Sequence, residues 1–498
     1  MDAQRKRNGC FLFHRFGLRV SISADAEYLH ARLCKPSHNE DVACPIGVLW
    51  LDCAYFLMVR FLWEKSSPGM KDQKMQTLSD VVRDVAKKEG LSRDGRKEGP
   101  FRGLMSRWRR RESGIELLRI LAMLMIVGHH CATHASIQLD ILPPSAFRFF
   151  MLMQIPFGKI GVALFFMISA WFLCEAEDPK LRQSLRRIWN LEREVLFYSI
   201  SIFILCSLLD VQSSLTNETV VFSSLFPIAS GNWWYLTAYV MFLLLYPFLT
   251  IGFKKIGYKR HGIICLIFLV AWGLIYGMTG LGNMNFSNYS FVYFVYLYIL
   301  ISFYRWYMKP LSTKAAMLFC GVGTLFVVLN VAIRDYVPMD LGFIENVDHN
   351  RLFLCSEGKA PIVLVSFGLL ILFSRWNFCS TFINAVSSAT FGVYLIHEHF
   401  SLRDYLWSDE LYPFSKLIVS DHAILSCIAI IVLIFIGCIV IDIVRQICFV
   451  ICVDRKADML FDMLCNDISS SSRIRRIKKR FVDKYLRENV DEPDDNEN

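Results

Sequence analysis

The apolar stretch at residues 112–136 carries the residues whose types and spacing best fit chemistry. Arg119 and His130 lie eleven positions apart in it. In a helix they return to within ~20° of one face, about 16 Å apart along the axis. Ionisable side chains at membrane depth are costly and are usually functional. A neutral imidazole is a competent general base, and a guanidinium binds phosphate groups or a developing oxyanion. This pair therefore predicts acid–base chemistry beside an anion-binding group.

The other ionisable residues of this stretch are interpreted as structural. A single histidine in an apolar helix is usually a core residue, and His129 points ~100° away from His130. Glu116 shares roughly the face of Arg119. It lies near the helix end, however, where a polar side chain reaches the interface without taking part in chemistry. We assign a functional role to Arg119 and His130 alone, because two such residues on one face are expensive in a single crossing.

The composition indicates the class of protein that surrounds this stretch. Of 498 residues, 54% are hydrophobic and 14% are aromatic, which is typical of a polytopic membrane protein. The net charge of +9 comes from basic residues between apolar segments and in the tail. No zinc-finger, RNA-binding or helix-turn-helix pattern accompanies it, so we expect no nucleic-acid partner. The 16 cysteines have no repeating spacing and are interpreted as small buried hydrophobes.

The apolar segments predict an all-α fold with ten membrane crossings. Basic residues gather in the alternate loops 176–193, 252–261 and 305–314. The positive-inside rule then places both termini in the cytoplasm. The ten predicted segments are 114–136, 156–175, 194–211, 232–251, 262–279, 290–306, 314–333, 360–376, 382–400 and 423–444.

The chain divides into three predicted regions. Residues 1–104 mix charged residues with Cys and His, and their apolar run at 42–63 is interrupted by an Asp and an Arg. We expect a poorly structured extension without a signal peptide, which a start codon assigned too early would explain. Residues 105–445 form the membrane domain. Residues 446–498 form a basic cytoplasmic tail with a disordered acidic end.

Two further features lie in and after the second apolar segment. Gly158 and Gly161 are small, so they predict a close approach by another helix. Arg186 and Arg187 follow on the predicted cytoplasmic side. Adjacent guanidinium groups can clamp phosphates by bidentate hydrogen bonds. Taken alone, this arginine pair is better explained by the positive-inside rule.

Aromatic and histidine residues gather at two predicted outer helix ends. Trp233 and Trp234 begin the fourth segment, where interfacial aromatics are ordinary but also suit stacking on a sugar. His397 and His399 flank Glu398 at the end of the ninth. This is not the HExxH pattern, whose two histidines share one helix face. We therefore predict no metal site and favour outer-face recognition or a hydrated helix end.

Residues 105 to about 445 resemble the acyltransferase-3 family of integral membrane O-acyltransferases. The family's arginine–histidine pattern falls on Arg119 and His130, and its arginine pair falls on Arg186 and Arg187. The stretches that carry the resemblance, in chain order, are RESGIELLRILAMLMIVGHH, FFMISAWFL, LRRI, WWYLTAY…LYPFL and FGVYLIHEH.

Three positions depart from the pattern of many members. Ala163 stands where they have Asp, Ala170 where they have Gly, and Tyr239 about where they have Glu. With these departures, the chain resembles a branch of the family that modifies capsules and other surface polysaccharides.

The resemblance implies transfer of an acyl group, most often acetyl, from cytoplasmic acyl-coenzyme A. The acceptor is a hydroxyl of a cell-surface glycan or lipid-linked sugar, and the location is a bacterial plasma membrane. His130 acts as the general base or carries the acyl group covalently, and we prefer the base. Arg119 binds the donor phosphates or the oxyanion.

The remaining site residues and partners follow from the same resemblance. Arg186 and Arg187 stand at the donor's entrance. The acceptor-side candidates are Trp233, Trp234, Tyr394 and His397. The expected partners are acyl-coenzyme A, the glycan acceptor and membrane lipid, with no metal.

A transporter, flippase or polymerase of lipid-linked sugars is the alternative. Such proteins are also polytopic, aromatic and inside-positive, and they use intramembrane charges. The Arg119–His130 column combined with the later motifs favours the acyltransferase.

Overall fold

The computed structural model divides the chain into two units, Met1–Ser66 and Ser67–Asn498, and all described residues belong to the second. The predicted N-terminal extension lies outside the described residues except for its last turn, and so does most of the basic tail. The described residues are 100–109, 111–139, 141–209, 218–275, 290–336, 358–453, 459–463 and 465.

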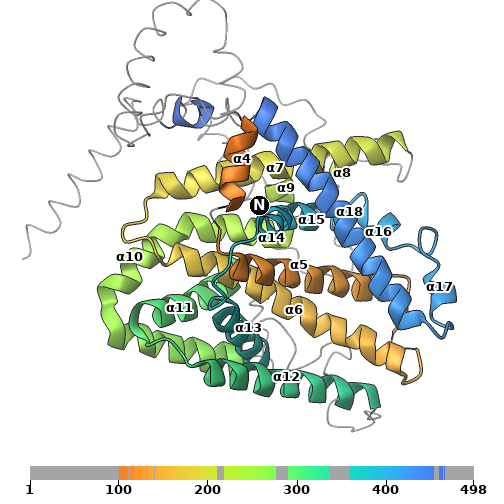
Figure 1. Cartoon of the computed structure of the whole chain (residues 1–498), viewed down its shortest axis with the longest axis horizontal. Coiled ribbons are helices and arrows are strands. Elements are labelled where there is room, and N and C mark those ends of the chain that lie inside the picture. Colours follow the sequence, from red (N-terminus) through yellow and green to blue (C-terminus); the bar gives the residue numbers. More distant parts are fainter. Residues whose placement is uncertain are drawn as a thin grey trace, which may run out of the picture. The chain divides into compact units, whose positions relative to one another are not determined.

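The described part of the chain is helical and contains no strand. Its centre is the pair α5 (Ser113–His134) and α6 (Ala146–Leu173), which lie side by side in Figure 1. Within the described residues, five helices are long and apolar enough to cross a membrane. They are α5, α6, α10 (Trp234–Phe268) together with η1 (Leu269–Ile275), α12 (Thr313–Tyr336) and α18 (Ala423–Cys452).

The other main helices are shorter or more polar. The apolar helices α11 (Phe291–Tyr307) and α13 (Ala360–Phe373) have fewer residues than a full crossing needs. The helix α7 (Leu181–Leu208) carries the basic residues of the predicted loop 176–193 in its first turns. Each of the ten predicted segments overlaps a helix, but the number of crossings stays a prediction.

Three predicted segments do not correspond to single straight helices. The fourth and fifth follow one another along α10, where Gly257 breaks the helical backbone at a φ of +76°. A left-handed conformation of this kind favours glycine. The ninth is split into α14 (Thr381–Ser388) and α15 (Thr390–His397), which meet at Ala389.

The helix α4 (Pro100–Arg109) precedes α5 and packs against the end of α18. Leu104 and Trp108 are buried with Val450 in a small apolar cluster. Trp108 Nε1 also donates a hydrogen bond to Ser388 Oγ at 3.2 Å. The predicted domain boundary at residue 105 therefore falls inside a helix, and the boundary itself stays a prediction.

The close approach of α5 and α6 depends on glycine, as the sequence predicts. A Cβ at Gly158 would overlap the side chain of His129, and a Cβ at Gly161 would overlap the carbonyl of Ala122. Both contacts are made to α5. The absence of side chains at these two positions lets the helix that carries Arg119 and His130 rest directly on α6.

We expect Gly158→Ala to lower the stability of the folded protein by about 1–3 kcal/mol, the usual cost of overpacking. The midpoint of thermal unfolding in detergent measures this loss. Gly437→Ala is the matched control, because a Cβ at this helical position of α18 meets no atom within 4 Å. Alanine there should be neutral or stabilising, since it is the better helix former. Equal midpoints for the two variants would contradict tight packing at Gly158.

Candidate active site

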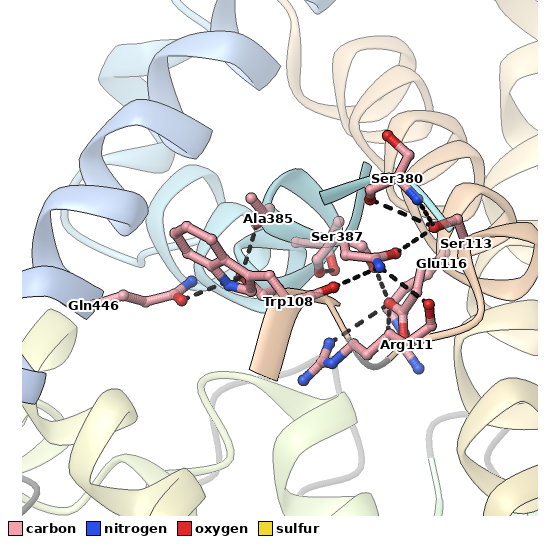
Figure 2. Close-up of polar contacts among 12 residues, drawn as sticks. Trp108, Arg111, Ser113, Glu116, Ser380, Ala385, Ser387 and Gln446 are labelled. Atoms are coloured by element: carbon pink, nitrogen blue, oxygen red, sulfur yellow. Dashed lines mark hydrogen bonds and ion pairs between the residues drawn. The ribbon is translucent and has the colours of Figure 1, made fainter. Parts of the chain in front are cut away.

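The first turn of α5 holds a buried carboxylate that fixes Arg119. Glu116 is only 4% exposed and accepts hydrogen bonds from the Arg119 guanidinium and the Ser387 hydroxyl. Arg111 lies 3.6 Å from the same carboxylate oxygen (Figure 2). Glu116 lies near the helix end, as expected, but the expectation that it reaches the interface is wrong. It is a positioning residue for Arg119 because it supplies that guanidinium with a buried counter-ion.

Further polar contacts tie the beginning of α5 to α14. The Ser113 hydroxyl donates to Asn384 Oδ1 at 2.8 Å and accepts from the Ser380 backbone N–H at 2.7 Å. Asn384 Nδ2 donates to the Trp108 carbonyl at 2.6 Å. Figure 2 shows these side chains converging between α4, α5 and residues 380–388. Buried hydrogen bonds of this kind fix one arrangement of the elements, so Arg119 is held by a rigid frame.

The other end of α5 meets the end of α15. His130 Nδ1 lies 2.8 Å from His397 Nε2 and 3.3 Å from Glu398 Oε1. His134 Nε2, one turn further along α5, lies 3.0 Å from the same Glu398 oxygen. The side chains of His130 and Glu398 are each 13% exposed. The structure therefore brings together His130 and His397, two of the predicted site residues that are far apart in the sequence.

The hydrogen bonds of His397 decide which nitrogen of His130 keeps a free lone pair. His397 Nδ1 lies 2.5 Å from the Val393 carbonyl, which can only accept, so Nδ1 carries the proton. The Nε2 atom of neutral His397 must then accept from His130 Nδ1–H. This assignment follows from the hydrogen-bond partners, and it leaves a lone pair on His130 Nε2.

Arg119 and His130 lie on one helix, about 16 Å apart along its axis. Glu116, which pairs with Arg119, also accepts a hydrogen bond from Ser387 on α14, while His130 contacts the last turn of α15. The partner of Arg119 lies still further from His130, so the two side chains have separate surroundings at two levels of α5.

A comparison with models of protein families identifies the family of this chain. The acyltransferase domain of the acyltransferase-3 family matches residues 112–443. The chain belongs to the acyltransferase-3 family. It is an integral membrane acyltransferase that transfers groups other than aminoacyl groups. Comparisons with characterised proteins and with solved structures gave no match.

The two adjacent arginines of the acyltransferase point to different surroundings. Arg186 Nη2 lies 2.7 and 2.8 Å from the two carboxylate oxygens of Asp462, in the segment that follows α18. The Arg187 guanidinium lies 5.8 Å from the centre of the Tyr246 ring in α10. Arg187 and Arg119 are also both close enough to the Tyr239 hydroxyl to interact with it electrostatically. Arg187, unlike Arg186, therefore points toward α10 and not toward the segment after α18.

The predicted acceptor-side aromatics have unequal access. Trp233 is 1% exposed, and its ring packs 5.5 Å from that of His399. The Trp234 ring lies 6.2 Å from Phe294 in α11. Tyr394 is 7% exposed, and its ring lies 6.3 Å from His397. Of these residues His397 contacts His130 and Tyr394 borders His397, whereas Trp233 packs against His399.

Sequence reasoning missed a buried charged cluster beside α15. Asp442 accepts from the Tyr198 hydroxyl at 2.7 Å and from Arg445 Nε at 2.8 Å, and Arg445 Nη2 lies 3.1 Å from Glu194. A Cβ at Gly392 would overlap Asp442, so α15 rests directly on this cluster. The sequence feature that could have revealed this cluster is the pair Asp442 and Arg445, which lie three positions apart near the end of an apolar helix. This cluster supports the helix that presents His397.

Proposed function

We propose that the acyltransferase moves an acyl group, acetyl in the simplest case, from cytoplasmic acyl-coenzyme A to a hydroxyl of a cell-surface or exported glycan. The contact of His130 Nδ1 with His397 Nε2 is the observation that carries the proposal. It leaves His130 Nε2 free to accept a proton at a side chain that is 13% exposed. The acyltransferase-3 match supports the reaction class.

The proposed topology has ten crossings with both termini in the cytoplasm of a bacterial plasma membrane. The basic loops between alternate helices support this orientation. Arg119 then lies near the cytoplasmic face and His130 toward the outer face. The donor would enter past Arg187 from inside, and the acceptor would reach His130 from outside.

The proposed reaction follows from this arrangement. His130 Nε2 takes the proton of the acceptor hydroxyl, and the oxygen attacks the thioester carbonyl. A C–O bond forms, the C–S bond breaks, and the proton passes from His130 to the departing thiolate of coenzyme A. Since Arg119 lies about 16 Å from the base along α5, it cannot contact the same tetrahedral centre. Its guanidinium is placed to bind the donor phosphates instead.

The NMR spectrum of the surface glycan tests this function. Cells that express the protein should show O-acetyl methyl signals that mild base removes. Cells that lack it, or that express His130→Asn, should not show them. Unchanged acyl content with altered chain length or altered glycan export would instead identify a polymerase or transporter.

A further inference from the structure

Three side chains direct possible metal-ligand atoms to one place at the outer end of α5. His130, His397 and Glu398 each offer an atom, and these three atoms lie within 4.8 Å of one another. His134 Nε2 lies beside this cluster, 3.0 Å from Glu398 Oε1. This oxygen is buried and accepts no well-aligned hydrogen bond within the described part of the chain. A buried carboxylate oxygen without a proper donor is expensive, and a cation between the three groups would satisfy it.

The separations of these atoms fit zinc. Nitrogen and oxygen ligands lie ~2.0–2.1 Å from Zn²⁺ in tetrahedral sites, so neighbouring ligand atoms are about 3.3 Å apart. The observed separations are 2.8 Å between His130 Nδ1 and His397 Nε2, and 3.3 Å from Glu398 Oε1 to His130 Nδ1. Two imidazoles with one carboxylate suit zinc, whereas calcium and magnesium prefer oxygen ligands.

The surrounding structure orients these ligands. His134, one turn beyond His130 on α5, lies 3.0 Å from Glu398 Oε1 and can orient this carboxylate. The other nitrogen of His397 contacts the Val393 carbonyl, and zinc-binding histidines usually have such a partner. The sequence spacing at 397–399 argues against a metal site, but here the ligands come from two helices.

We propose that His130, His397 and Glu398 bind Zn²⁺ from the outer side, with His134 holding Glu398 in place, and that bound zinc inhibits acyl transfer. The binding site rests on geometry alone, whereas the inhibition rests on the proposed function. Zinc would take the lone pair of His130 Nδ1. The neutral ring keeps one N–H, so its proton moves from Nδ1 to Nε2, and the zinc ion releases bound water. His130 Nε2 then has no lone pair, and the base is lost.

Cobalt binding tests the site without reference to activity. The purified full chain in detergent, stripped with a chelator, is titrated with Co²⁺, which gives strong visible absorption in a tetrahedral site and is displaced by Zn²⁺. We expect one equivalent to bind. His134→Gln should weaken binding on the order of 10–100-fold, the loss known for groups that orient a ligand. His422→Gln, an exposed histidine just before α18, is the matched control. Absence of binding, or equal affinity in His134→Gln and wild type, would overturn the proposal.

Zinc titration of acyl transfer tests the inhibition. Each rate is normalised to the zinc-free rate of the same variant. The zinc concentration that halves transfer should rise in His134→Gln by the same factor as the dissociation constant. If chelation abolishes transfer and zinc restores it, zinc is catalytic and the inhibitory role is refuted. Zinc that binds without slowing transfer would refute it as well. If cobalt binds but no transfer occurs under any condition, the metal site stands and the proposed function fails.

Discussion

Replacing His130 by asparagine should lower the rate of acyl transfer by ~10²–10⁴-fold, the usual contribution of a general base. The asparagine amide can occupy the position of Nδ1 and still donate to His397 Nε2, but nothing remains at the position of Nε2. The helix pairing should therefore survive while the base is lost. The initial rate of transfer in inside-out vesicles measures the effect, and the melting midpoint in detergent confirms folding.

His129→Asn is the control for this substitution. His129 packs against α6 at Gly158 and has no contact with His397 among the described residues. We expect a much smaller loss of transfer there. A stronger defect at His129 than at His130 would mean that α5 presents a different face to the acceptor. Wild-type activity of His130→Asn would show that His130 is not the general base. If labelled acyl groups remain on wild-type protein after rapid denaturation but not on His130→Asn, His130 is the covalent carrier.

Arg119→Lys should raise the KM for acyl-coenzyme A by about 10–100-fold, because a hydrogen bond to a charged group contributes ~1.5–3 kcal/mol. The ammonium can keep an ion pair with Glu116, so the fold should persist, but it cannot reproduce the planar fork that binds phosphate. Donor titration in inside-out vesicles measures KM and kcat separately. High acyl-coenzyme A should partly rescue Arg119→Lys and should leave His130→Asn defective.

Arg186→Lys serves as the comparison for the donor side. Arg186 is engaged by Asp462, so we expect its substitution to change KM far less than substitution of Arg119. A larger rise in KM at Arg186 would place the phosphate contacts near the segment after α18. A fall in kcat without a change in KM for Arg119→Lys would assign Arg119 to the transition state instead.

Local sequence pattern predicted the helices well because apolar runs and their spacing are properties of one segment. The eleven-residue separation of Arg119 and His130 gave their common face, and Gly158 gave the close approach of α6. Both depend only on the period of an α-helix and the size of a side chain. The break at Gly257 falls in the basic loop 252–261 that the sequence places between the fourth and fifth segments.

The contacts of His397 and Glu116 could not be predicted in the same way. His397 meets His130 across 267 positions of sequence. Glu116 is buried because Ser387, from a distant helix, covers it. Such contacts depend on how helices pack, and no spacing within one segment records that. The ninth predicted segment also hid a division into α14 and α15, which is what directs Ser387 to one end of α5 and His397 to the other.

The charged cluster beside α15 has a consequence for the biogenesis of the protein. Glu194 and Tyr198 lie on α7, yet the partners that satisfy them, Arg445 and Asp442, are synthesised about 250 residues later. Until α18 leaves the translocon, a carboxyl group and a phenol of α7 lack those partners in an apolar environment. Completion of α18 is therefore the event that satisfies these groups of α7, and a nascent chain that stops before residue 442 leaves Glu194 and Tyr198 without those partners.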